Sequence, residues 1–270
     1  MSDAPEPTRK RALITGAGSG IGAEAARHLA QRGYRVVLVD RNAEGVSEVA
    51  AAIGEAAVAR TCDVSSGDAV LALAADLAAE EGVPDVLVNC AGLGRWLRIE
   101  DTTPEEAERM IGAPYLAAFN MTHAFMPGML ARGSGTIIHV NSPACVMAWP
   151  GAVGYTAARF ALRGLHEALC QDLAGTGVRS CHIIFGRVDS SYFVNNPGAA
   201  DHMPGIAAII RTLSPEECGR VIARVAGHPR RQTLYPFMLK LFYWNTLILP
   251  GLTRWLVRIT GAKRTPTRGA

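Results

Sequence analysis

Ser142, Tyr155 and Arg159 are the residues of this chain whose types and spacing best suit chemistry. The tyrosine follows the serine by thirteen positions, and the arginine follows the tyrosine by four, one helical turn along the same face. A free tyrosine phenol has a pKa of about 10 and is a poor base at neutral pH, so it needs a neighbouring cation that favours the phenolate. The spacing therefore predicts proton transfer to or from an alcohol oxygen.

A glycine-rich turn near the start of the chain predicts a nucleotide site. A short apolar strand over 12–15 runs into this turn, and a helical pattern follows it. The turn contains Gly16, Ala17, Gly18, Ser19, Gly20, Ile21 and Gly22. Glycine allows positive φ and close backbone approach to a pyrophosphate, and the N-terminus of the next helix attracts the anion. A tight turn without any ligand has the same composition, so that alternative stays open for the turn alone.

Asp40 supports a nucleotide site and bears on which nucleotide binds. It ends a β-branched strand over 35–39, about twenty residues beyond the glycines, where a carboxylate accepts hydrogen bonds from an adenosine ribose. Because an acid repels a 2′-phosphate, Asp40 favours NAD over NADP, whereas the adjacent Arg41 can receive that phosphate. NADP therefore remains open, and so does an ordinary strand-end turn at Asp40.

Four motifs in order make the chain similar to the short-chain dehydrogenases/reductases, from about Arg11 to about Ser191. The family's motifs appear as Thr15-Gly16 with Gly20 and Gly22, as Asp63-Val64, as Asn89-Cys90-Ala91-Gly92, and as Tyr155 with Arg159 in a YxxxK pattern. The resemblance implies that Tyr155 is the general acid/base and that Ser142 polarises the carbonyl oxygen. It also implies a set of cofactor-binding residues: Gly16, Ser19, Gly20, Ile21, Gly22, Asp40, Arg41, Asp63, Val64, Asn89, Ala91, Gly92, Tyr155, Arg159, Gly186, Val188 and Ser190.

The family's NNAG motif has one substitution here, at Cys90, and the sequence departs from the family's pattern at three further positions. Arg159 replaces a lysine that binds the nicotinamide ribose and relays protons, and a guanidinium keeps the charge but does not release a proton. Pro114 aligns with an asparagine at a helix kink whose carbonyl holds a water, and we expect proline to keep the kink and the carbonyl. Phe185 replaces a proline, so we expect a looser or redirected turn before Gly186. The alternatives are a solvated arginine at 159 and an ordinary helix boundary at 114.

Strand and helix patterns alternate along the chain, which predicts an α/β fold with one Rossmann-like, doubly wound parallel sheet in a single domain. The ligand site is then expected at the carboxyl ends of the strands. The expected strands lie near 12–15, 35–39, 57–61, 86–90, 136–141 and 180–185. We expect a disordered arm over 1–9, a dinucleotide-binding and catalytic domain over 10–232, and an apolar and basic extension over 233–270.

The composition argues against several other classes of protein. A net charge of +3 is too small for a nucleic-acid surface and no zinc-finger spacing is present, so neither nucleic acid nor a metal ion is expected. The six cysteines form no CxxC pair and are expected to be buried thiols in a reducing cytosol. The N-terminus lacks the hydrophobic core of a secretory signal, which also favours the cytoplasm.

Two later segments carry less information. Residues 191–211 contain Pro197, Gly198, Pro204 and Gly205 and are expected to form a mobile lid over the substrate. Residues 234–258 are rich in aromatic and aliphatic side chains but are too interrupted to span a membrane. Packing in the core or an oligomer is the first interpretation of them, a wall for an apolar substrate the second, and contact with a membrane surface the third.

The leading hypothesis is an NAD(H)-preferring oxidoreductase that interconverts an apolar secondary alcohol and its ketone. The alternative is a cofactor-binding relative without redox turnover, acting as a sensor, scaffold or partner subunit, or catalysing a non-redox dehydration or cyclisation. The resemblance further implies a homodimer or homotetramer formed through the helices near 104–131 and 155–173.

Overall fold

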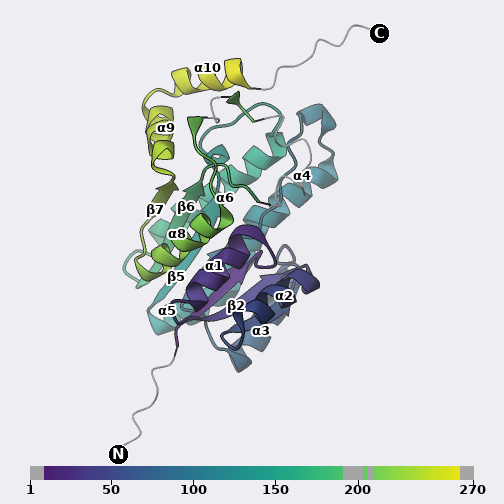
Figure 1. Ribbon diagram of the computed structural model, residues 1–270, viewed down its shortest axis with the longest axis vertical. Helices are drawn as coiled ribbons and strands as arrows, with labels where there is room; N and C mark the ends of the chain where they lie inside the picture. The colour runs from purple at the N-terminus through teal and green to yellow at the C-terminus, as the bar shows by residue number, and fades with distance from the viewer. Residues whose placement is uncertain (1–8, 191–202, 206–208, 262–270) are drawn as a thin grey trace, which may run out of the picture.

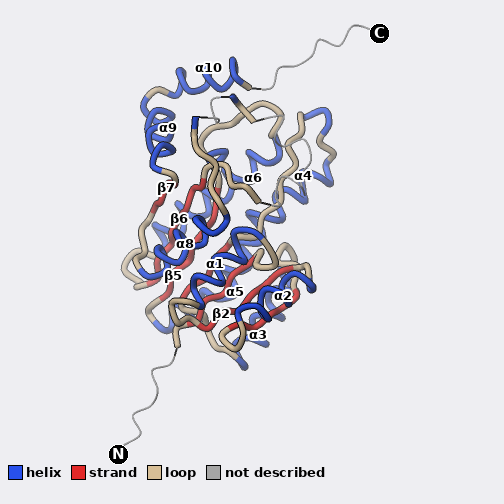
Figure 2. The backbone as a smooth tube through the Cα atoms, in the orientation of Figure 1, coloured by secondary structure: helices blue, strands red, loops and turns tan. Residues whose placement is uncertain are grey.

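The centre of the molecule is one sheet of seven strands. The computed structural model describes residues 9–190, 203–205 and 209–261. The strand order is β3-β2-β1-β4-β5-β6-β7, and every neighbouring pair is parallel. Helices cover both faces of this sheet (Figures 1 and 2). The order reverses between β1 and β4, where doubly wound sheets bind ligands. The predicted Rossmann-like α/β fold is confirmed.

The elements follow one another in regular alternation. The strands are β1 (Arg11–Thr15), β2 (Arg35–Asp40), β3 (Ala57–Thr61), β4 (Val86–Asn89), β5 (Gly135–Asn141), β6 (Val178–Phe185) and β7 (Gln232–Tyr235). The α-helices are α1 (Gly20–Ala30), α2 (Ala43–Ile53), α3 (Gly67–Glu80), α4 (Pro104–Ile111), α5 (Ala117–Arg132), α6 (Val153–Asp172), α8 (Pro215–Gly227), α9 (Phe237–Ile248) and α10 (Pro250–Thr260). Shorter helices are η1 (Ile99–Asp101), η2 (Gly112–Leu116) and η3 (Pro143–Cys145).

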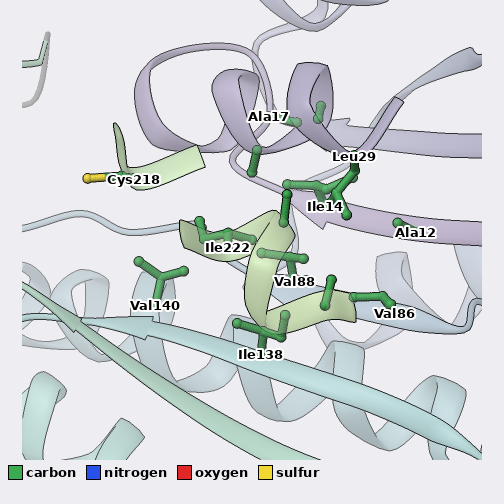
Figure 3. Close-up of a cluster of buried hydrophobic side chains, with 14 of the residues drawn as sticks. Ala12, Ile14, Ala17, Leu29, Val86, Val88, Ile138, Val140, Cys218 and Ile222 are labelled. Atoms are coloured by element: carbon green, nitrogen blue, oxygen red, sulfur yellow. The ribbon is translucent and has the colours of Figure 1, made fainter. Parts of the chain in front are cut away.

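The core has two layers because successive side chains of a strand point to opposite faces of the sheet. Ile14 of β1 faces α1 and α8, where it joins a cluster that includes Leu29 and Ile222 (Figure 3). The preceding residue, Leu13, joins a second cluster with Phe125 on the other face, under α3 and α5. The central strands are therefore continuous apolar runs, and their carboxyl ends are held in fixed positions for the site.

The sheet extends one strand beyond those that the sequence patterns predicted. β7 pairs with β6 from His182↔Gln232 to Phe185↔Tyr235. The domain boundary expected between residues 232 and 233 therefore falls inside a strand, and the extension begins after β7. A four-residue run bounded by a proline is too short to show an alternation that identifies it as a strand.

Parts of two other expectations lie outside the described residues. These are residues 1–8 of the expected N-terminal arm and most of the expected lid over 191–211. The C-terminal helices are described, and α9 and α10 lie at the end of the molecule opposite α2 and α3 (Figure 1). Leu239 and Tyr243 of α9 are buried in a small cluster with Ile184 and Leu234. Within the described ranges, none of the helices has the length and apolar character needed to cross a bilayer.

Candidate active site

The predicted site residues converge on two adjoining cavities at the carboxyl ends of the strands. Their volumes are about 680 Å³ and about 450 Å³, and because Gly16, Asp40, Arg41 and Gly92 line both, they are two lobes of one cleft. The first lobe is also lined by the predicted residues Ser19, Gly20, Ile21, Gly22, Ser142, Tyr155, Arg159, Gly186, Val188 and Ser190. The second lobe adds Asp63, Val64 and Ala91.

The glycine turn depends on backbone contacts that side chains would block. Gly16 has a φ of 67°, and a Cβ placed on it would lie 2.9 Å from the Cα of Ala91. A Cβ on Gly22 would lie 2.0 Å from the carbonyl oxygen of Gly16, which leaves room for glycine alone. Thr15 Oγ1 accepts hydrogen bonds from the N–H groups of Cys90 and Ala91, both at 3.1 Å. These contacts join the ends of β1 and β4 into one rigid cradle.

Asp40 is held against the glycine turn by its own hydrogen bonds. Its Oδ2 accepts from the N–H of Gly18 at 3.0 Å, and its Oδ1 accepts from the N–H of Asn42 at 3.0 Å. Asn42 also caps α2, because its side chain accepts from the N–H of Gly45. The carboxylate therefore has a fixed place beside both lobes, and Arg41 lies next to it.

The second lobe is shaped by the turn that follows β3. Ser65 donates to Asp63 Oδ1 from both its hydroxyl, at 2.6 Å, and its N–H, at 3.0 Å. The hydroxyl hydrogen bond is the largest reason why the pKa of Asp63 is lowered, so this carboxyl group is an anion. Asn120 Nδ2 donates to the carbonyl oxygens of Val64 and Ser65 at 3.2 and 3.1 Å, which ties the turn to α5.

Asn89 is the predicted cofactor residue that lines neither lobe. Its side chain is buried behind the cleft, where Nδ2 lies 3.3 Å from Thr122 Oγ1 and 3.4 Å from His139 Nδ1. The structure therefore places the Asn89 side chain in a supporting position between β4, β5 and α5, and its contact with the cofactor stays a prediction. The spacing of the motif could not separate these two roles.

Tyr155 and Arg159 lie one turn apart on α6, and both are buried. The Cζ of Arg159 lies 4.9 Å from the centre of the Tyr155 ring, within cation–π range. Arg159 is 7% exposed, so it is not the solvated helix residue that we considered as an alternative. Its Nη1 donates weakly to the carbonyl oxygen of Val140 at 3.4 Å, and its buried Nε has no hydrogen-bond partner in the described part of the chain.

Two glycines show how the fold joins motifs that are distant in sequence. A Cβ on Gly92 would lie 3.0 Å from Nη2 of Arg159, so the glycine leaves space for the guanidinium. A Cβ on Gly20 would lie 3.8 Å from the Cβ of Ser190, which places the end of the 186–190 segment over the glycine turn. The two ends of the first lobe are thus brought within reach of a single dinucleotide.

Ser142 is oriented by its neighbours so that its hydroxyl proton can point into the lobe. Its Oγ accepts from the N–H of Ala144 at 3.2 Å at the start of η3, which leaves the O–H to donate elsewhere. Asn141 Oδ1 accepts from the N–H of Ser142 at 2.9 Å, and Asn141 Nδ2 donates to the carbonyl oxygen of Arg159 at 3.1 Å. One amide side chain therefore holds Ser142 and α6 together.

The same amide contacts a buried histidine that no motif singled out. Asn141 Nδ2 lies 3.0 Å from Nε2 of His182 on β6. Burial lowers the pKa of His182 well below its usual value, so this ring is neutral and accepts the hydrogen bond. Asn141 and His182 are supporting residues that the sequence analysis missed, because their importance comes from pairing across two strands.

Pro114 interrupts the helical segment between α4 and α5. Residues Gly112–Leu116 form the π-helix η2, and Pro114 is buried within it. A π-bulge is a common way for a helix to accommodate a residue that removes an N–H donor. The segment is therefore not a straight α-helix through 114, in agreement with the predicted kink. The water-holding role of the carbonyl stays a prediction.

The turn after β6 differs from our expectation. Phe185 is 2% exposed and packs in the core. The N–H of Gly186 donates to the carbonyl oxygen of Tyr235 at 2.9 Å, and Leu213 exchanges two 2.8 Å backbone hydrogen bonds with Arg187 and Asp189. The looser turn is not observed, because burial of Phe185 and three backbone hydrogen bonds hold this segment, whereas a redirected turn stays a prediction.

An aromatic wall completes the first lobe. The ring of Trp96 lies 5.2 Å from that of Trp149 and 5.5 Å from that of Tyr155, measured between centroids. Leu239 and Phe242 of α9 line the same lobe. Neither tryptophan belongs to a predicted motif, since Trp96 and Trp149 come from loops far apart in the chain and follow no common spacing.

The cysteines behave as inert thiols. Cys62, Cys145, Cys181 and Cys218 are buried, and all six are free. Burial raises the pKa of Cys145 to about 12 and that of Cys181 to about 11, so both stay protonated at neutral pH. The prediction of mostly buried thiols is confirmed, whereas the cytosolic location stays a prediction.

The chain belongs to the short-chain dehydrogenase family, whose sequence profile matches residues 10–199. Over 173 residues it is 37% identical to D-threitol dehydrogenase of Mycolicibacterium smegmatis, a match that covers 63% of this chain and 66% of that protein. The match thus spans slightly less than two thirds of this relative's length.

Solved structures of similar fold contain nicotinamide cofactors. One is a metagenomic short-chain oxidoreductase in complex with NADP, with a TM-score of 0.70 and 30% identity over 83% of this chain and 95% of that one. Another is 3-ketoacyl-(acyl-carrier-protein) reductase from Brucella melitensis complexed with NADH, with a TM-score of 0.74 and 29% identity over 84% of this chain and 96% of that one.

Proposed function

We propose that this protein is an NAD(H)-preferring oxidoreductase that interconverts an apolar secondary alcohol and its ketone. The observation that carries the proposal is the buried guanidinium of Arg159, 4.9 Å from the ring of Tyr155, in the same lobe as Ser142. A positive charge in this position stabilises the phenolate form of the tyrosine, which is the form that accepts a proton from an alcohol.

The residues of the cleft fit a nicotinamide dinucleotide. The glycine turn offers backbone N–H groups where a Cβ would collide, which suits a pyrophosphate. The Nε of Arg159 is buried without an acceptor in the described part of the chain, and ribose hydroxyls would supply one. When bound, the nicotinamide ring supplies or accepts the hydride. Asp40 would accept hydrogen bonds from the adenosine ribose and repel a 2′-phosphate, which supports NAD over NADP.

Each catalytic residue has a distinct part in the proposed reaction. Tyr155 exchanges a proton with the substrate oxygen, and Ser142 donates a hydrogen bond to the same oxygen. Arg159 stabilises the phenolate and would bind the nicotinamide ribose, but a guanidinium, unlike an ammonium group, does not relay a proton by releasing one. The proton must therefore reach solvent past Arg159 and not through it.

The walls of the first lobe support an apolar substrate. Trp96, Trp149, Leu239 and Phe242 line the same lobe as Tyr155, and the Trp96 ring lies 5.5 Å from the Tyr155 ring. The similarity to D-threitol dehydrogenase supports alcohol oxidation, while the aromatic wall of this chain favours an alcohol less polar than a sugar alcohol.

The test is to measure NADH binding by purified protein and then NADH consumption against a panel of ketones. We expect wild type to bind and turn over, and Tyr155→Phe to bind with similar affinity while turnover falls by about 1,000-fold. Binding without turnover that Arg159→Lys rescues would identify an enzyme impaired at residue 159. Binding without turnover in both forms would support the sensor, scaffold or non-redox alternatives, and absence of binding would refute the proposal.

We also propose that copies of the chain associate through α5 and α6. Phe119 on α5 is 45% exposed and Phe160 on α6 is 42% exposed, so each of these helices presents a large apolar side chain to solvent. Analytical ultracentrifugation of Phe119→Ser/Phe160→Ser tests this proposal, and we expect a smaller species than wild type. An unchanged mass would contradict it.

A further inference from the structure

The two C-terminal helices carry an exposed apolar surface that the cleft does not use. On α9, Phe237, Leu241, Trp244 and Ile248 are between 54% and 70% exposed. Their spacing of four, three and four residues puts them on one stripe of the helix. Leu239, by contrast, is 2% exposed and faces the interior, so α9 is apolar on both sides.

α10 continues this surface in a shorter form. Leu252, Trp255 and Ile259 are 44%, 49% and 44% exposed, and their spacing of three and four residues again defines one stripe. Thr253 and Val257 are buried on the other side. The docking surface is defined here as Phe237, Leu241, Trp244, Ile248, Leu252, Trp255 and Ile259.

The segment that carries the docking surface contains charges of one sign. All 24 acidic residues of the chain occur at or before Glu217, whereas ten of the 27 basic residues follow it. Lys240, Arg254 and Arg258 are exposed on α9 and α10, beside the apolar stripes. Long basic side chains at the edge of an apolar stripe extend their charges towards lipid headgroups while the stripe enters the acyl region.

We propose that the docking surface seats this protein on the surface of a bilayer that contains anionic lipids. A segment with tryptophans on its exposed apolar stripes and only basic charges in its own sequence has the composition of an interfacial membrane segment. A two-fold contact between copies would place this basic surface against itself, with no acidic residue in the segment to compensate. Anionic headgroups, in contrast, complement it.

Docking also brings the cleft close to lipid, because α9 contributes Leu239 and Phe242 to the wall of the first lobe. An apolar alcohol or ketone dissolved in the bilayer would then have a short path to Tyr155. This consequence rests on the proposed function, whereas the docking itself does not.

The test is flotation of the purified full chain with vesicles of phosphatidylcholine alone or mixed with phosphatidylglycerol, without cofactor or substrate. We expect binding to the mixed vesicles, weakened at high salt because the headgroup attraction is screened. Leu241→Ser is expected to lower vesicle affinity about tenfold, the effect of withdrawing one leucine from an apolar phase. The matched control is Leu71→Ser on α3, a leucine 50% exposed against 54% for Leu241, and we expect no change.

A second pair of variants keeps the test decisive if Leu241→Ser does not fold. Arg254→Glu/Arg258→Glu is expected to abolish the preference for anionic vesicles, while Arg32→Glu at the end of α1 leaves it intact. The proposal is overturned if wild type does not float with mixed vesicles, or if the paired controls lose binding equally. A mass that falls in Leu241→Ser, with no vesicle binding by wild type, would assign the surface to a contact between copies. Vesicle binding without ketone turnover would contradict the proposed function alone.

Discussion

The two sides of the cleft are built by different means. On the glycine side, Gly16 and Gly22 bring backbone against backbone at distances that admit no side chain. On the tyrosine side, Ser142, Tyr155 and Arg159 line the cleft with their side chains. Asn141 donates a hydrogen bond to the carbonyl oxygen of Arg159, and Gly92 leaves space for its guanidinium. The glycine motif of the family is kept on the first side, whereas its YxxxK motif is altered on the second, where Arg159 takes the place of lysine. A site made of backbone tolerates few changes, whereas one made of side chains admits substitutions that preserve charge or shape.

The strongest test of this contrast is to add one methyl group on the glycine side. In Gly22→Ala the new Cβ would meet the carbonyl oxygen of Gly16, so the turn must move. We expect NADH affinity to fall by at least about tenfold and stability to fall by about 1–3 kcal/mol, as overpacking does. Isothermal titration and thermal unfolding measure the two effects.

The control for Gly22→Ala is the same substitution on the other side of the molecule. Gly164 of α6 is exposed, and a Cβ on it meets nothing within 4 Å. Gly164→Ala is expected to stabilise the protein by about 0.5–1 kcal/mol without changing NADH affinity. Equal NADH affinity in the two variants would contradict the claim that NADH binding requires the close backbone contact at Gly22.

On the tyrosine side, charge and shape can be separated at residue 159. Arg159→Met removes the buried cation beside Tyr155, and we expect kcat to fall by about 100-fold, in the range of general acid–base contributions. Arg159→Lys keeps the charge and adds a group that can release a proton, so kcat should equal or exceed that of wild type. Steady-state kinetics between pH 6 and about 9 distinguish the two. Wild-type turnover in Arg159→Met would show that the guanidinium takes no part.

Asp40 is the one side chain on the glycine side that is expected to choose the cofactor. Asp40→Ser removes the charge that opposes a 2′-phosphate while it leaves Arg41 in place. We expect the ratio of NADH to NADPH affinity to fall by roughly 10–100-fold, the usual value of hydrogen bonds to a charged group. Competitive titration with both nucleotides gives this ratio. An unchanged ratio would mean that Asp40 serves only the turn, through its bond to Gly18.

The sequence predicted the glycine side well because short-range signals specify it. Strand, glycine turn, helix and acid lie within about thirty residues, and each has its own spacing rule. The kink at Pro114 was also accessible, because proline acts on its own helix. Both cases depend on residues close together in the chain.

Other parts of the site could not be predicted, because contacts between residues far apart in the sequence determine their structure. Phe185 fits its turn only because β7, a strand too short to recognise, supplies the carbonyl of Tyr235 to Gly186. Trp96, Trp149 and Leu239 form one wall from three distant segments. Asn89 belongs to a recognised motif, yet its neighbours on β5 and α5 place it behind the cleft. Spacing along the chain carries no information on such neighbours.

Behind the tyrosine side lies a cluster of three neutral histidines, which predicts a specific weakness in acid. Burial lowers the pKa of His139 to about 3 and that of His166 to about 4, and it lowers the pKa of His182 as well. An unfolded histidine has a pKa of about 6.5, so below that pH the unfolded chain binds protons that the folded chain does not. The stability that these three histidines contribute is therefore fully present above about pH 6.5 and is lost as the pH falls towards 4.

The part of this loss that comes from one histidine can be measured. Each histidine contributes at most about 1.4 kcal/mol per pH unit to the slope, and His166→Gln removes one contribution between about pH 6.5 and 4. Glutamine can still hydrogen-bond the hydroxyl of Ser180, which lies 2.8 Å from His166 Nδ1, so folding should be kept. Urea unfolding at a series of pH values measures the slope, with the exposed His228→Gln as control. Equal slopes in the two variants would mean that His166 is already protonated in the folded protein. The histidine behind the tyrosine side of the cleft would then be charged and not neutral.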